Sequence, residues 1–143
     1  MNSFRESISA FFRRFSKPKS DLLQLEYQEP RMYLILREDL SMKYLQGTHA
    51  VCQFALDHPE EFQRWGNQTV IALSVFNGLT LQRLSAELAV EVAADKMQDN
   101  LNWSMSVFFE PDLESPLPTA IAIFENGNGI VAKRLKYLNM ATK

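Results

Sequence analysis

Four short apolar runs alternate along this chain with segments of helical periodicity, and this alternation is the strongest constraint on its fold. Each run is too short for a helix and is typical of a buried β-strand. Because strands separated by helices tend to pair in parallel through right-handed crossovers, the order β-α-α-β-α-β-β-α predicts an α/β domain. We expect a small mixed sheet of about four strands with helices on both faces; its third and fourth strands are either an antiparallel pair or separate neighbours. The predicted strands are MYLILRED (residues 32–39), QTVIALSV (68–75), WSMSVFFEP (103–111) and TAIAIFE (119–125).

Each predicted helix has an apolar stripe on one side and polar residues on the other. The segment SMKYLQGTHAVCQFALDHPEEF (41–62) gives a first helix, in which Gly47 permits close approach of a neighbour, and a second helix that begins at Pro59. Helix 79–98 has Thr80 as its predicted N-cap, and helix 130–140 is the last. The predicted inward residues are Leu45, His49 or Ala50, Cys52 or Gln53 and Leu56 in the first helix; Leu81, Leu84, Leu88 and Val92 in the third; and Ile130, Leu135 and Leu138 in the last.

Residues 1–20 differ in charge from the rest of the chain. They hold five basic residues and one acidic residue, a net +4, so the formal total of −2 leaves residues 21–143 with −6. We expect an amphipathic basic helix in residues 1–20, a linker in residues 21–31 and an α/β domain in residues 32–143. The helix either packs through residues 4–15 against the domain or a partner protein, lies on an anionic membrane surface, or is a targeting peptide or flexible arm. Its apolar stripe is Phe4, Ile8, Phe11, Phe12 and Phe15.

The composition limits the classes of function. Cys52 is the only cysteine, so an internal disulfide is excluded and a reducing, cytoplasmic compartment is expected. One cysteine and two histidines are too few for a zinc site, and we expect neither a metal nor a cofactor. No apolar run approaches the roughly 18 residues of a membrane span. The acidic charge of residues 21–143 argues against a large non-specific nucleic-acid face, although a small basic cleft remains open.

Three motifs follow one another in a distinctive order. Arg37-Glu38-Asp39-Leu40 ends the first strand, Gln46-Gly47-Thr48-His49-Ala50 lies on the first helix, and an acidic loop before Thr119 follows the third strand. In this order they resemble the R-x-D-L segment, the Q-x-x-H-A signature and the acidic loop with threonine of the type-2 peptidyl-tRNA hydrolase family, over residues 32–138. The chain departs from that family because the glycine- and lysine-rich stretch before the helix is missing. Lys43 is the only lysine nearby, one place from the expected position.

The resemblance implies a hydrolase that cleaves the ester between a peptidyl or aminoacyl group and the terminal ribose of tRNA. In such a reaction an acid orients the water, while a lysine, an amide or a hydroxyl stabilises the oxyanion. The candidates implied for these roles are Lys43, Gln46, Glu110 or Asp112, and Thr119. Candidates for substrate contacts are His49 and, if they border the cleft, Lys133 and Arg134. The partner is then tRNA or a nucleotide-like ligand, and a homodimer is left open.

A structural interpretation competes with each of these roles. In this interpretation Lys43 is a solvated lysine at a helix start, residues 110–112 are a solvated strand end, and His49 is a hydrogen-bonded packing residue. Cys52 is expected to be a small buried hydrophobic residue. The alternative function is a catalytically inactive relative that binds a nucleotide, an RNA end or a protein. Both functions require the start of the first helix and the loop after the third strand to face each other.

Overall fold

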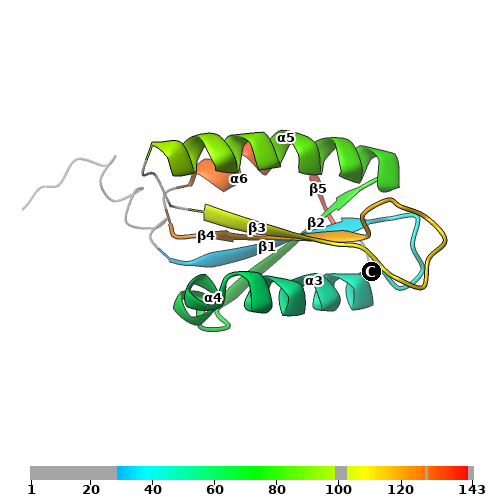
Figure 1. Ribbon diagram of the computed structural model, residues 1–143, viewed down its shortest axis with the longest axis horizontal. Coiled ribbons are helices and arrows are strands. Elements are labelled where there is room, and N and C mark those ends of the chain that lie inside the picture. The colour runs from blue at the N-terminus through cyan, green and yellow to red at the C-terminus, as the bar shows by residue number, and fades with distance from the viewer. Residues whose placement is uncertain (1–28, 99–102, 128, 142–143) are drawn as a thin grey trace, which may run out of the picture.

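A five-stranded mixed sheet lies between two helical layers (Figure 1). The structure is a computed structural model that describes residues 29–98, 103–127 and 129–141. The strand order is β3-β4-β1-β2-β5, in which β1 and β2 are parallel and all other neighbours are antiparallel. The predicted α/β class and the order of its first eight elements are confirmed. The helix predicted in residues 1–20 and the linker up to residue 28 lie outside the described residues.

Four of the strands are those that the apolar runs predict, and the fifth is a short edge strand. The sequence pattern extends the last helix to residue 140, but α6 ends at Leu135, where the Leu135 carbonyl accepts a 3.0 Å hydrogen bond from the Leu138 N–H. Asn139 and Met140 then pair with the edge of β2. This pairing satisfies backbone groups of β2 that would stay unpaired if the helix continued to residue 140. The strands are β1 Arg31–Arg37, β2 Thr69–Val75, β3 Trp103–Phe108, β4 Ala120–Glu125 and β5 Asn139–Met140.

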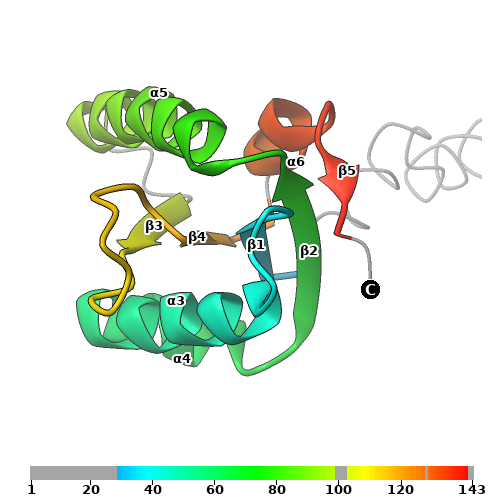
Figure 2. The same ribbon diagram turned by 90° about the vertical axis from the view of Figure 1, so that its right-hand side faces the viewer.

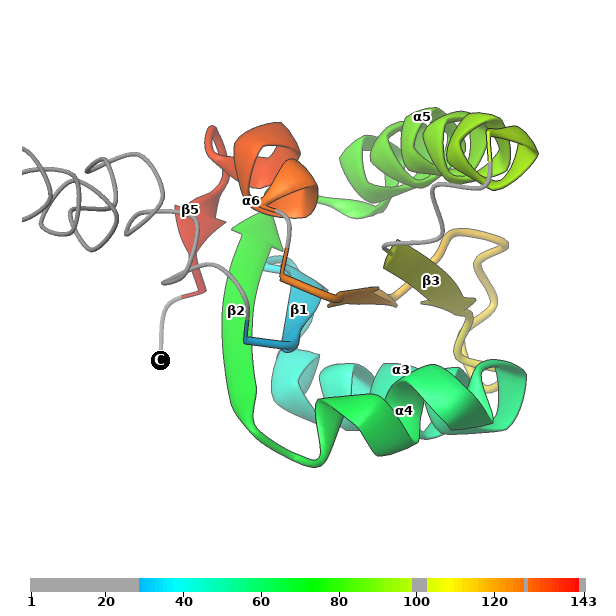
Figure 3. The same ribbon diagram turned by 90° about the vertical axis from the view of Figure 1, so that its left-hand side faces the viewer.

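The helices cover both faces of the sheet (Figures 2 and 3). Helices α3 (Lys43–Asp57) and α4 (Pro59–Trp65) pack on one face, and α5 (Gly78–Met97) and α6 (Ile130–Leu135) on the other. Helix α5 buries the predicted stripe of Leu81, Leu84, Leu88 and Val92. Its N-cap is Asn77 instead of Thr80, because the Asn77 Oδ1 atom accepts hydrogen bonds from both the Thr80 N–H and the Thr80 hydroxyl. Within the described residues, none of the helices combines the length and apolarity that crossing a membrane requires.

Helix α3 packs on the sheet in a different rotation from the predicted one. Its buried residues are Gln46, Gly47, Ala50 and Phe54, whereas Leu45, Leu56 and Cys52 are exposed. The helix carries two competing apolar stripes, and the one containing Phe54 is buried because its ring enters the core beside Phe124. Gly47 permits this close packing, since a Cβ atom there would lie 2.8 Å from Leu36 Cδ2. The rotation places Gln46 on the sheet side of the helix.

Two contacts fix the carboxyl end of α3 to the edge strand β3. The Ser106 hydroxyl donates to Asp57 Oδ2 at 2.7 Å, and His58 Nε2 lies 3.0 Å from the Met105 carbonyl oxygen. Because β3 runs directly into the loop that contains Glu110, these contacts also fix the position of that loop relative to α3. The helix and the loop are therefore held as one unit.

A buried carboxylate joins β1 to α6 on the other side of the sheet. Glu125 Oε2 accepts a hydrogen bond from the Tyr33 hydroxyl, and its Oε1 accepts one from the Val131 N–H. Burial, and next the negative charge of Glu125, raise the pKa of Tyr33 from 10.0 to about 12.

This raised pKa predicts a loss of stability in alkali. Since the folded pKa exceeds the unfolded one, the contribution of Tyr33 is complete below pH 10 and is lost as the pH rises through about 12. Urea midpoints measured between pH 9 and pH 12 should fall more steeply for the wild type than for Tyr33→Phe. Equal slopes for the two proteins would contradict the prediction.

Candidate functional site

The connections after β1 and β2 turn to opposite faces of the sheet. The chain passes from β1 to α3 on one face and from β2 to α5 on the other, so the carboxyl ends of these parallel strands form a topological switch point. Open α/β sheets bind ligands outside the carboxyl ends of strands at such a point. Strand β3 also ends at this edge, because both β1 and β3 are antiparallel to β4. The loop 109–118 therefore reaches the same edge, as Figure 2 shows.

The sequence candidates Gln46 and Glu110 meet at this edge. Gln46 Nε2 lies 2.9 Å from Glu110 Oε2, across 64 positions of sequence. An ionised carboxylate only accepts hydrogen bonds, so the Gln46 amide must present its NH₂ group to Glu110. Gln46 is buried and Glu110 is half-buried, which leaves the carboxylate oriented by the amide and partly open to solvent. The start of α3 and the loop after β3 thus face each other as expected.

Lys43 lies against the protein, so the prediction of a solvated lysine is wrong. Its side chain is only 11% exposed, and its Nζ atom forms an ion pair with Glu38 in the loop between β1 and α3. Lys43 and Gln46 are three residues apart on α3 and share one side of the helix. Glu38 therefore draws the ammonium group towards the edge of the sheet where Gln46 and Glu110 lie.

The structure brings two other candidates near this pair and leaves one exposed. The His49 ring packs edge-on against Phe108, with centroids 5.0 Å apart, which is a packing role. Thr119 is fully buried, and both its N–H and its hydroxyl donate to the Phe108 carbonyl, at 2.8 Å and 3.2 Å. Its hydroxyl thus closes the base of the loop that carries Glu110. Asp112 is exposed in the same loop, and Glu110 is the acid that contacts Gln46.

Lys133 and Arg134 lie away from Gln46 and Glu110. Both are exposed on α6, which packs on the face of the sheet opposite to α3 (Figure 3). Arg134 forms an ion pair with Glu91 of α5, with an Nε–Oε2 distance of 3.0 Å. The structure therefore does not bring these two basic residues together with Gln46 and Glu110, and their expected contact with substrate at this site lacks a geometric basis.

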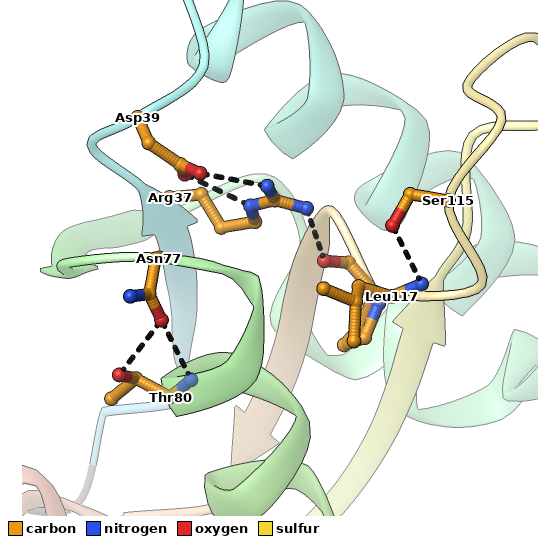
Figure 4. A network of polar contacts seen from close by, with 7 residues as sticks. Arg37, Asp39, Asn77, Thr80, Ser115 and Leu117 are labelled. Atoms are coloured by element: carbon orange, nitrogen blue, oxygen red, sulfur yellow. Dashed lines mark hydrogen bonds and ion pairs between the residues drawn. The ribbon is translucent and has the colours of Figure 1, made fainter.

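Arg37 holds the switch point together, a role that the sequence pattern did not reveal. Its guanidinium donates two hydrogen bonds to the Asp39 carboxylate, at 3.0 Å and 2.8 Å, and one to the Pro118 carbonyl at 3.2 Å (Figure 4). The hydrogen bond from Arg37 lowers the pKa of Asp39 below its ordinary value. The available signal was a run of three successive charges that begins with the last residue of β1, Arg37. Arg37 joins the end of β1 to the far end of the loop that carries Glu110.

Gly78 leaves the space that the Arg37 guanidinium occupies. A Cβ atom at Gly78 would lie 2.8 Å from the Cζ and Nη1 atoms of Arg37 and 2.9 Å from Leu117 Cδ1. Alanine usually stabilises a helix relative to glycine, yet we predict that Gly78→Ala lowers the free energy of unfolding by about 1–2 kcal/mol through overpacking. Urea denaturation measures this change, with the exposed neighbour Leu79→Ala as the matched control. A stabilised Gly78→Ala protein would show that Arg37 is free to move.

Comparisons with known proteins identify no further candidate residues. Neither the protein-family models nor the curated proteins contain a match to this sequence. Among the side chains of residues 29–98, 103–127 and 129–141, no group of three or more His, Cys, Asp or Glu is arranged to hold a metal ion. The groups that can take part in chemistry at the candidate site are the oriented Glu110 carboxylate, the Gln46 amide and the Lys43 ammonium.

Proposed function

We propose that this protein is an ester hydrolase that acts on the bond between a peptidyl or aminoacyl group and the terminal ribose of tRNA. The observation that carries the proposal is the contact between Gln46 and Glu110 at the switch point of the sheet. It joins two of the three motifs that resemble type-2 peptidyl-tRNA hydrolases. Arg37 and Asp39, from the remaining motif, hold the far end of the same loop through the Pro118 carbonyl.

In the proposed reaction Glu110 is the general base. Its carboxylate takes a proton from a water molecule as the water oxygen bonds to the ester carbonyl carbon, and the carbonyl oxygen becomes an oxyanion. Collapse of this intermediate breaks the bond to the ribose oxygen, which receives the proton from Glu110. The products are a ribose hydroxyl and a carboxylic acid, which releases its proton to solvent and leaves as a carboxylate. Gln46 orients the base by donating its amide hydrogen bond to Oε2, which leaves the other carboxylate oxygen for the water.

Lys43 supplies positive charge on the same side of α3 as Gln46. A fixed cation near a developing oxyanion lowers the barrier more in a half-buried site than in water. Its ion pair with Glu38 restricts the side chain. Glu38 is therefore a positioning residue, which acts on the reaction through Lys43.

A catalytically inactive relative that binds a nucleotide, an RNA end or a protein is the second candidate. The Lys43–Glu38 pair favours it, because an ammonium group that is already neutralised attracts a phosphate or an oxyanion less strongly. This candidate predicts binding at the same edge without turnover.

Hydrolysis of an N-acetylated aminoacyl-tRNA by the purified protein tests the proposal. We expect turnover, a loss of about 10²-fold in kcat for Lys43→Ala, and a smaller loss for Glu38→Gln with partial recovery in Glu38→Asp. Lys133→Ala, which removes an equal charge from the opposite face, is the matched control and should retain wild-type kcat. Absence of turnover, or turnover that depends on Lys133 and not on Lys43, would overturn the proposal.

A further inference from the structure

Exposed apolar side chains gather on two segments beside the Gln46–Glu110 contact. At the start of α3, Met42, Tyr44 and Leu45 are exposed by 60%, 47% and 42%. In the facing loop, Phe109 and Leu113 are exposed by 50% and 39%. The hydrogen bond between Gln46 and Glu110 joins the two segments. We call residues 42–45 and 109–114 the acidic–apolar face. Apolar side chains of this size, exposed together, mark an interaction site.

Negative charge accompanies the apolar groups of this face. The loop sequence FEPDLESPLP (109–118) contains Glu110, Asp112 and Glu114 and no lysine or arginine. The one basic residue at the start of α3, Lys43, is paired with Glu38. A ligand for this face must therefore combine apolar side chains with positive charge.

We propose that the acidic–apolar face binds residues 4–19 of the same chain. This segment, which lies outside the described residues, carries the four phenylalanines and the isoleucine of the predicted apolar stripe. It also carries five basic residues against one acidic residue. An amphipathic segment laid into an apolar surface, with its charges opposite to those of the rim, is a common mode of recognition. Binding of this segment does not require that the protein hydrolyses an ester, but the face includes Lys43 and Glu110, so both proposals concern the same surface.

Within the described residues, the exposed face of α5 is another surface with large apolar side chains. Leu79, Val90 and Met97 are exposed there by 63%, 71% and 88%. However, α5 itself carries two basic and three acidic residues, and residues 130–136 beside it add three basic residues, so this layer lacks the excess of negative charge that residues 109–114 offer to a basic segment. Charge therefore selects the acidic–apolar face.

Residues 20–28, which connect this segment to the described part of the chain, are numerous enough for the segment to reach the face. Residue 29 lies at the amino end of β1, and the acidic–apolar face lies beyond its carboxyl end. Strand β1 has seven residues and spans about 23 Å at roughly 3.3 Å per residue. Residues 20–28 extend to about 30 Å when fully stretched. Intramolecular binding then benefits from a high effective concentration, which two separate molecules lack.

The single native cysteine provides the test. Cys52 is exposed on α3, so a nitroxide spin label attached to it reports on the vicinity of the face without any substitution. In the ¹⁵N-labelled full-length chain, we expect the label to broaden the amide signals of residues 4–19 and to leave those of residues 20–28 less affected. Asp112→Lys with Glu114→Lys should abolish the broadening. Adding Arg13→Glu and Arg14→Glu to that protein should restore it, because the charges are then exchanged across the contact.

Three outcomes would overturn the inference. One is broadening of residues 4–19 no stronger than that of the linker. The second is broadening that also appears when spin-labelled ¹⁴N protein is mixed with ¹⁵N-labelled protein that carries no spin label. Such broadening would show that residues 4–19 bind the face of a second copy. The third is an absence of broadening in solution together with loss of the signals of residues 4–19 on vesicles of anionic phospholipid, which would assign the segment to a membrane surface.

Discussion

Replacing Glu110 with glutamine is expected to lower kcat by about 10²–10⁴-fold, the usual contribution of a general base. The substituted side chain keeps the shape of glutamate, and its amide oxygen still accepts the 2.9 Å hydrogen bond from Gln46. It cannot take a proton from water. We therefore expect KM and the free energy of unfolding to stay close to their wild-type values, so that the loss is confined to the chemical step.

Two variants serve as controls for this substitution. Glu114→Gln removes an equal charge from an exposed position of the same loop and should change kcat less than twofold. Asp112→Asn separates the two acids that the sequence left as alternatives, and it should resemble Glu114→Gln because Asp112 is exposed. The same kcat for Glu110→Gln and wild type would exclude Glu110 as the base. A large effect of Asp112→Asn would assign that role to Asp112.

The substitution Glu125→Ala should produce the largest loss of stability, about 2–5 kcal/mol in the free energy of unfolding. Glu125 is 2% exposed and accepts hydrogen bonds from the Tyr33 hydroxyl at 3.2 Å and the Val131 N–H at 3.1 Å. Alanine leaves both buried donors without an acceptor, and it also leaves a cavity between β4 and the start of α6. Urea denaturation followed by circular dichroism measures the change.

A graded series distinguishes this cause from a general effect of losing charge. Glu125→Gln retains an oxygen for the Val131 N–H and should cost less than Glu125→Ala. Glu114→Ala, on the exposed loop, should stay within about 0.5 kcal/mol of wild type. If Glu125→Ala also stays within that range, Glu125 does not anchor α6. Glu125 lies on the α6 side of the sheet, so substitutions of Glu125 should change kcat much less than substitutions of Glu110.

The element order was predictable because it rests on local periodicity. Short apolar runs and the stripe of α5 follow from the spacing of residues along the chain, and both are confirmed. The rotation of α3 was not predictable, since two stripes have similar apolarity and the choice depends on the space beside Phe124. The strand at Asn139–Met140 was missed for the same kind of reason, because it exists only through pairing with β2.

The candidate site was predictable in its residues but not in its interactions. The order of motifs indicated Gln46 and left Glu110 and Asp112 as alternatives; Gln46 and Glu110, far apart in sequence, are the two that meet in the structure. The pairing of Lys43 with Glu38 depends on the path of the loop after β1, which no spacing rule provides. The role of Arg37 depends in addition on the space left by Gly78 on a third segment.

Binding of a non-hydrolysable substrate analogue tests the location of the site most directly. The probe is an adenosine whose ribose carries N-acetylphenylalanine through an amide bond in place of the ester. On its addition to ¹⁵N-labelled protein, we predict the largest shift changes at the Gln46 side-chain amide, with further changes around Glu110 and Lys43. Changes centred instead on Lys133 and Arg134 of α6, or none at saturating probe, would contradict a hydrolytic site at this edge of the sheet.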